Sequence, residues 1–225
     1  MKDYRERLER GIFEIVIITI SILLAFALER WWDRQLDTGS REELVSSLVL
    51  EFEATAEDLK YALQTHESRR RGALALSQIQ ADTIESVDPD MISQYWYWAV
   101  TPDETFPPSG VLQSAISSGS LSLIGSEKLT SKLASWSDRL NNFTQTERVL
   151  ADYTAQVFWP SVAQDVFIPL NKEKIGRETD EVILKPSTRN HLNFLVLGSD
   201  VAIGQVQELQ QEVDEILELL KIESG

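Results

Sequence analysis

A run of seventeen residues near the N-terminus, Ile12 to Leu28, is apolar except for a few polar side chains, and only Glu14 among them is charged. As an α-helix this run spans roughly 25 Å, which is near the lower limit for crossing a hydrocarbon core of about 30 Å. Trp31 and Trp32 follow it, and indole rings favour the layer of lipid headgroups. We therefore expect residues 12–32 to form a transmembrane helix with Trp31 and Trp32 as interfacial anchors.

A cleaved signal peptide is the competing interpretation of this segment. Basic residues precede the apolar run, and Ala25-Phe26-Ala27 fits the small-residue cleavage pattern. Acidic residues dilute the basic segment, however, Glu14 interrupts the apolar one, and the chain begins at Met1. We interpret the segment as a retained anchor.

The distribution of basic residues indicates the orientation of the anchor. Four basic residues lie within residues 1–11, against Arg30, Arg34 and Arg41 on the other side. Because basic residues are enriched on the cytoplasmic side, the denser cluster favours a short cytoplasmic N-terminus at residues 1–11. Residues 33–39 would then be a juxtamembrane stalk and hinge, and residues 40–225 a periplasmic domain of a bacterial inner-membrane protein.

Composition excludes several classes of function. The chain has 36 acidic and 21 basic residues, a net charge of −15, so its surface repels nucleic acid and anionic lipid. It has no cysteine, which excludes disulfides, thiolate nucleophiles and metal centres with cysteine ligands. An apolar content of 43% is sufficient for one folded domain beyond the anchor.

Apolar spacings of three and four predict an all-α domain, a helical bundle built from long helices at residues 40–82, 126–158 and 187–221. A hinge at Thr38-Gly39-Ser40 and a capping box of Ser40 with Glu43 would begin the first of them. Its predicted buried face consists of Val45, Leu48, Phe52, Thr55, Leu59, Ala62 and His66.

The last helix has the most regular pattern of the domain. Its predicted buried face consists of Leu192, Leu195, Ser199, Ala202, Val206, Leu209, Val213, Ile216 and Leu220. This spacing also suits a coiled coil, but flanking apolar residues such as Val196 and Leu217 widen the stripe, which favours a bundle helix. Shorter helices lie between the long ones, and an exposed connector with a brief extended piece at Val182-Ile183-Leu184 precedes the last helix.

The membrane helix carries the first candidate interaction site. Five residues lie on roughly one face of it, and most are small or polar, as at close helix contacts: Gly11, Glu14, Ile18, Ser21 and Ala25. A carboxylate at membrane depth is costly, which favours a role for Glu14 against a partner helix. The alternative is that Glu14 reaches the headgroups or pairs with Arg10 one turn earlier.

The aromatic run Tyr95, Trp96, Tyr97 and Trp98, beside a proline-rich loop, is the second candidate. Such residues form docking or ligand surfaces, and they also form cores. Four consecutive aromatic residues on a helix point nearly all round it, so we expect at least one to be exposed or to meet a neighbouring element.

No pattern indicates an enzyme, a metal or a cofactor. His66 and His191 are the only histidines, and neither lies in a metal-binding spacing. Ser117-Ser118-Gly119-Ser120 lacks the spacing of a nucleophile elbow. The basic run Arg69-Arg70-Arg71 is short and lacks interleaved aromatic residues, so we interpret it as a solvated helix face.

Two stretches resemble a known family. One is Gly11 to Trp32, with Glu14-Ile15 near its start, and the other is Phe106 to Trp136, with Ser118-Gly119 and Leu123-Ile124. Both resemble the bacterial single-pass membrane protein family termed domain of unknown function 6090. The resemblance implies an inner-membrane anchor and a helical extracytoplasmic domain, with no activity attached. The chain departs from the family pattern at Glu29-Arg30, where amide residues are more typical.

These observations lead to one functional hypothesis and an alternative. We expect a non-enzymatic membrane-anchored interaction protein, an accessory or scaffold subunit of a membrane protein complex. It would contact the lipid bilayer and, through its membrane helix, a partner membrane protein or its own copies. The alternative is an extracytoplasmic sensor or small-ligand-binding module that acts through a partner protein.

Overall fold

The computed structural model describes residues 2–100, 104–164 and 179–224, with side chains from Thr38 onward and at four earlier positions. Every element in these ranges is helical, which confirms the all-α prediction. The α-helices are α1 (Lys2–Gln78), α2 (Pro89–Val100), α3 (Gly110–Ser118), α4 (Glu127–Tyr153), α5 (Trp159–Val162), α6 (Asp180–Leu184) and α7 (Pro186–Glu223). Two 3-10 helices, η1 (Ile84–Ser86) and η2 (Ser120–Leu123), and a π-helix, η3 (Thr154–Phe158), join them.

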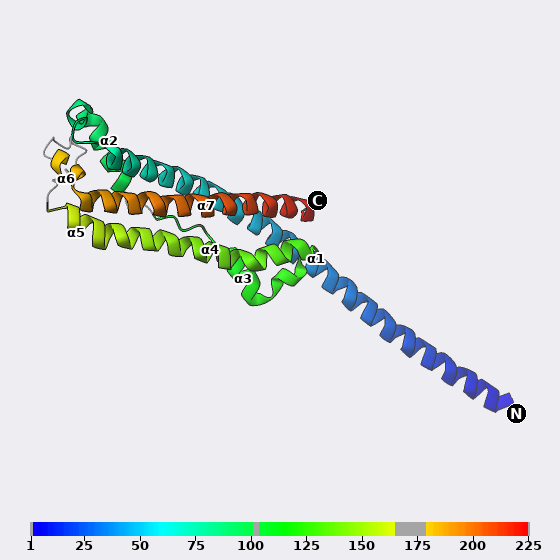
Figure 1. Cartoon of the computed structure of the whole chain (residues 1–225). Coiled ribbons are helices and arrows are strands. Elements are labelled where there is room, and N and C mark those ends of the chain that lie inside the picture. The colour runs from blue at the N-terminus through cyan, green and yellow to red at the C-terminus, as the bar shows by residue number, and fades with distance from the viewer. Residues whose placement is uncertain (1, 101–103, 165–178, 225) are drawn as a thin grey trace.

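Helix α1 is continuous over 77 residues, and its first part projects alone from the rest of the molecule (Figure 1). The predicted hinge and helix start at Thr38-Gly39-Ser40 are therefore wrong. Glycine costs about 1 kcal/mol relative to alanine in a helix, but ending one helix and nucleating another costs more. The helix consequently continues through Gly39 and joins the apolar segment directly to the bundle.

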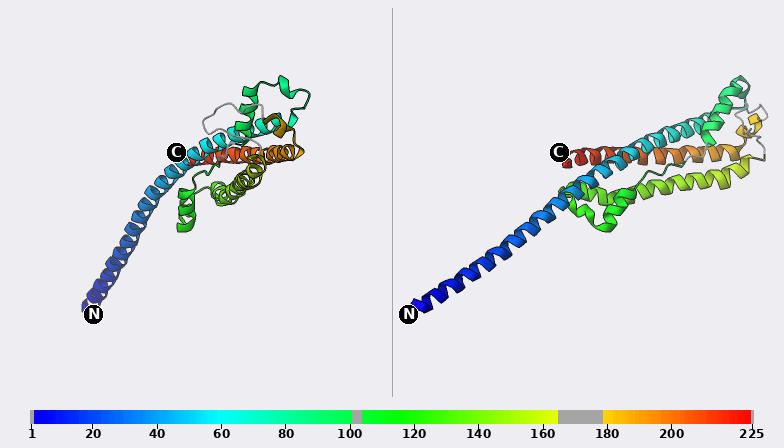
Figure 2. Two further views of the ribbon diagram at one scale, coloured as in Figure 1. Left: turned by 90° about the vertical axis from the view of Figure 1, so that its left-hand side faces the viewer. Right: turned by 180° about the vertical axis from the view of Figure 1, so that it is seen from behind.

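The second part of α1 packs with α4 and α7 as a bundle of three long helices (Figure 2). Helix α7 is antiparallel to α1, because Arg41 pairs with Glu223 at one end and Arg189 donates to the backbone oxygen of Ile79 at the other. Helix α4 is antiparallel to α7, as the 2.7 Å ion pair of Lys132 with Glu215 and the bond of Tyr153 to His191 require.

The predicted buried faces of the first and last helices are confirmed. All seven residues of the α1 face, Val45 to His66, and all nine of the α7 face, Leu192 to Leu220, are buried. Flanking Val196 and Leu217 are half-buried and pack against the core. Helix α7 is therefore a bundle helix within the chain.

The core consists of two separate apolar clusters. The first, here called the near core, joins residues 45–62 of α1 to the N-terminal end of α4 and the C-terminal end of α7. It lies next to the projecting part of α1. The second, the far core, joins residues 73–79 of α1 to α2, α6, the start of α7 and the turn containing Phe158. No buried residue belongs to both clusters.

The connector before α7 differs from its prediction. Residues 182–184, expected to be extended, belong to helix α6, in which Val182 and Ile183 are buried in the far core. Asp180 and Glu181 lie in the first turn of α6, where acidic side chains interact favourably with the helix dipole. Tertiary burial together with this charge placement explains a helix that the short sequence pattern does not reveal.

The predicted membrane-spanning segment lies largely outside the described side chains. A search of the described residues finds no helix that is both long and apolar enough to cross a membrane. Within residues 12–32 only Leu23, Leu24, Phe26 and Leu28 have described side chains, and all four are more than half exposed.

Candidate functional site

The predicted interaction face of the membrane helix lies on the projecting part of α1. The side chains of Gly11, Glu14, Ile18, Ser21 and Ala25, and of the anchors Trp31 and Trp32, fall outside the described residues. Their roles stay predictions. The neighbouring Leu23, Leu24, Phe26 and Leu28 point to different sides of the helix and are 59–70% exposed, so these four apolar side chains are not covered by any described residue.

The four aromatic residues of α2 are divided between the core and the surface. Trp96 is completely buried, and its ring lies 6.2 Å from that of Phe158. Tyr97 is half exposed, and the guanidinium of Arg71 lies 5.5 Å from the ring centre of Trp98. Trp96 thus belongs to the far core and cannot form an exposed docking surface.

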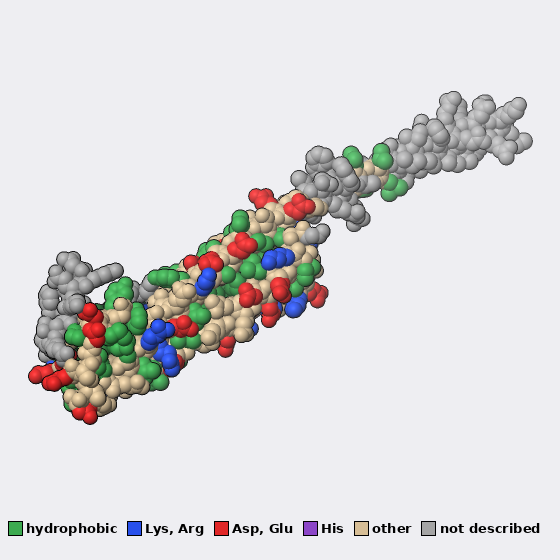
Figure 3. Space-filling view, turned by 90° about the horizontal axis from the view of Figure 1, so that it is seen from above, with side chains coloured by type: hydrophobic (Ala, Val, Ile, Leu, Met, Phe, Trp, Pro, Cys, Tyr) green, Lys and Arg blue, Asp and Glu red, His purple; other side chains and the backbone are tan. Residues whose placement is uncertain are grey.

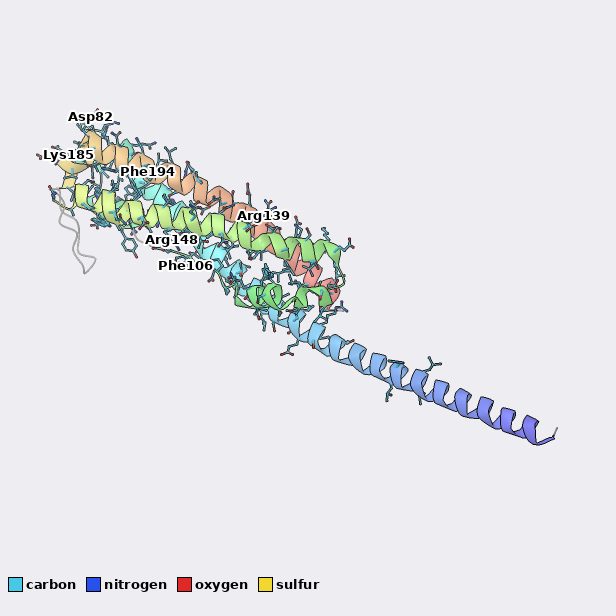
Figure 4. The ribbon with its side chains drawn as sticks, turned by 90° about the horizontal axis from the view of Figure 1, so that it is seen from below. Asp82, Phe106, Arg139, Arg148, Lys185 and Phe194 are labelled. Carbon is cyan, nitrogen blue, oxygen red and sulfur yellow. The ribbon has the colours of Figure 1, made fainter. Side chains whose placement is uncertain are left out.

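Exposed apolar side chains lie close together on α4 and α7, around Phe194 (Figure 4). We call this surface the outer face and define it by Val149 and Tyr153 on α4 and Phe194, Leu197 and Val201 on α7. The exposed fractions are 66% for Leu197, 55% for Val201, 53% for Val149 and 40% for Phe194. The rings of Tyr153 and Phe194 stack at 3.9 Å, which links the two helices within this face.

A tyrosine–histidine pair supports the outer face. The hydroxyl of Tyr153 lies 2.6 Å from Nδ1 of His191. Tyr153 is the residue immediately before the π-helix η3. Burial raises the pKa of the Tyr153 phenol above its ordinary value of 10.0, so the hydroxyl remains protonated at neutral pH and can donate to the imidazole. The pair fixes the stacked Tyr153 ring and holds α4 against α7.

Between the two cores lies a cluster of buried polar side chains that the sequence did not predict. His66 on α1 bonds through Nε2 to Oε1 of Glu147 on α4, and both side chains are 1% exposed. Nη1 of Arg69 lies 3.3 Å from Nδ1 of His66. Because arginine can only donate, Nδ1 acts as the acceptor and Nε2 carries the proton that His66 donates to Glu147.

The prediction that Arg69-Arg70-Arg71 is a solvated helix face is wrong for Arg69, which belongs to this cluster. Arg69 is only 4% exposed, whereas Arg70 pairs with Asp200 at 2.5 Å and Arg71 covers Trp98. The position of His66 on an apolar helix face was the one available signal for the cluster. Glu147 also has apolar spacing with Phe143 and Leu150, but a carboxylate with that spacing is usually solvated.

The described residues form a surface groove but no candidate metal site. They include no group of three or more histidine, cysteine, aspartate or glutamate side chains placed to bind a metal ion. A groove of about 620 Å³ between α1 and α7 is lined by side chains of mixed type that include Glu67, Arg70 and Asp200. Acidic and basic side chains are both scattered over the face of the bundle shown in Figure 3.

Comparison with known proteins adds no further assignment. No family model, curated protein or solved structure matches the chain. The resemblance to domain of unknown function 6090 therefore stays a prediction.

Proposed function

We propose that the chain is a non-enzymatic membrane-anchored interaction protein, an accessory or scaffold subunit of a membrane protein complex in the bacterial inner membrane. The observation that carries the proposal is the continuity of α1, which links an uncovered apolar segment to the bundle without a break. An apolar helix that no protein covers is stable when lipid or another helix surrounds it.

The proposed membrane helix uses Gly11, Glu14, Ser21 and Ala25 to approach a partner helix, or a second copy of the chain, within the bilayer. The bundle adds the outer face, where five neighbouring aromatic and aliphatic residues on two helices offer a contact surface for a protein. The short N-terminus lies in the cytoplasm and the bundle in the periplasm.

Purification after gentle solubilisation tests the scaffold function. The tagged chain is expected to bring a stoichiometric partner or a second copy with it, and recovery as a bare monomer contradicts the proposal. Replacing Glu14→Gln should weaken this association if the carboxylate faces a partner. A variant that associates as well as the original chain shows instead that Glu14 reaches the headgroups.

The contribution of the outer face is tested separately in the bundle. Leu197→Asp should reduce recovery of the partner, because it places a charge in the apolar contact. Leu50→Asp is the matched control, since Leu50 is also 66% exposed but lies on α1 outside the outer face. Equal effects of the two variants would remove the outer face from the proposal and leave the membrane helix as the contact.

The absence of cysteine makes the orientation directly measurable. A single cysteine introduced as Ser117→Cys, at an exposed position on α3, should react with a membrane-impermeant maleimide when only the outer membrane is opened. Labelling that requires rupture of the inner membrane as well would show the opposite orientation.

A further inference from the structure

A buried polar layer crosses the bundle between the near and far cores. Helix α1 contributes His66 and Arg69, and α4 contributes Glu147, all less than 5% exposed. Along α1, His66 and Arg69 lie between residues 45–62 of the near core and residues 73–79 of the far core. The interruption of the apolar core coincides with this layer.

Helix α7 continues the layer with small and polar residues. The ion pair of Arg70 with Asp200 brings this part of α7 beside the layer on α1. Ser199 is completely buried there, and its hydroxyl has no hydrogen-bond partner among the described residues. The preceding Gly198 leaves room for Leu150, since an added Cβ atom would lie 2.3 Å from that side chain.

We propose that this layer divides the bundle into two units that open independently, each unit comprising one apolar core and the helix segments around it. Between the two clusters only Leu150 and Ala202 are buried apolar side chains among the described residues, and neither belongs to either core. Cooperative opening units follow contiguous buried contacts, and here these contacts end on both sides of the same polar residues.

The polar layer aligns the helices more than it binds the two units together. A buried ionic group loses hydration, so its net contribution to stability is small even where its bonds are well formed. Separating two buried partners is nevertheless costly, because each is left unpaired away from water. The bond between His66 and Glu147 therefore fixes the level at which α4 meets α1. The far unit can therefore open while the near unit, continuous with the projecting part of α1, stays folded.

Hydrogen exchange of the full chain in detergent micelles tests the two units with a matched pair of variants. Phe158 in the far core and Phe143 in the near core are both 0% exposed. Phe158→Ala should accelerate amide exchange on the order of 100-fold in α2 and residues 189–195 and leave residues 206–220 unchanged. Phe143→Ala should do the reverse.

Acceleration of both regions by either variant shows one cooperative unit and overturns the proposal. If Phe158→Ala does not fold, Phe158→Leu removes less of the packing and asks the same question. A third variant replaces His66, Arg69 and Glu147 together by leucine, which should join the cores. In that background, Phe158→Ala should accelerate exchange in both regions, and an effect that stays in the far unit contradicts the role given to the layer.

Discussion

The near and far cores share the long helices α1 and α7 and differ in the elements that complete them. The near core joins the long helices α1, α4 and α7, and the short helices α3 and η2 add Leu112, Ala115 and Leu121 to it. The ion pair of Arg139 with the buried Glu212, at 3.1 Å, links α4 to α7 beside this core. Around the far core, the short helices α2 and α6 and the π-helix η3 surround the large rings of Trp96 and Phe158. The same long helices α1 and α7 pass through both.

This difference shows how one helix can serve two packing arrangements. In the near core, the repeated spacing along α1 and α7 buries most of the apolar face against a third long helix, α4. Aromatic rings fill both cores, but the far core is completed by the short helices α2, α5 and α6 and the turn containing Phe158. The polar layer marks the place where one arrangement gives way to the other.

The largest loss of folding stability is expected from a change in the polar layer between the two cores. Glu147→Ala leaves His66 buried without its carboxylate partner, so it should lower the free energy of unfolding by about 3–5 kcal/mol. Asp200→Ala is the control, because the Asp200–Arg70 pair is exposed and should contribute at most about 1 kcal/mol. Urea unfolding measures both, and similar losses would show that the buried layer has no special role.

A smaller loss should be confined to the near side. The Glu51 carboxylate accepts from the backbone N–H groups of Val111 at 2.6 Å and Leu112 at 3.0 Å, and so holds the start of α3 against α1. Glu51→Ala should cost about 1.5–3 kcal/mol and speed amide exchange in α3. Exposed Glu53→Ala should change neither, and an unchanged α3 in Glu51→Ala would show that other contacts hold this helix.

The sequence predicted the near side better than the far side for a physical reason. A face such as Leu48–Phe52–Thr55–Leu59 follows from helical spacing alone, and the structure buries all of it. Helix α6 and the His66–Glu147 bond depend on which distant segments meet, which spacing does not specify. The continuity of α1 through Gly39 was also missed, because a glycine marks a break only where the flanking helices are weak.

Two glycines of α1 should respond in opposite directions. A Cβ atom on Gly72 would lie 2.4 Å from the backbone oxygen of Tyr95 on α2, whereas one on Gly39 would meet nothing within 4 Å. Gly72→Ala should therefore destabilise the far side by about 1–3 kcal/mol. Gly39→Ala should instead stabilise α1 by up to about 1 kcal/mol. Thermal unfolding monitored by circular dichroism compares them, and a stabilising Gly72→Ala would mean that α2 shifts freely away from α1.

Acid should weaken the near side through an exposed group. The hydrogen bond from Lys132, with its positive charge, lowers the pKa of Glu215 below its ordinary value of 4.5. The folded carboxylate therefore releases its proton more readily than the unfolded one, and this stabilisation is present above pH 4.5 and lost as the pH falls below it. Glu215→Gln should flatten this part of the pH dependence of unfolding, and an unchanged profile would show that screening removes the interaction.

Alkali should act on the far side with the opposite sign. Burial raises the pKa of Tyr153 above 10.0, so the folded phenol keeps its proton while an unfolded phenol ionises. The resulting stabilisation is complete below pH 10 and is lost as the pH rises above it. Hydrogen exchange between pH 9 and 11 should therefore accelerate more in residues 189–195 than in residues 206–220, after correction for the intrinsic rate. Tyr153→Phe cannot ionise and should remove this difference, whereas its persistence would assign the alkaline loss to another group.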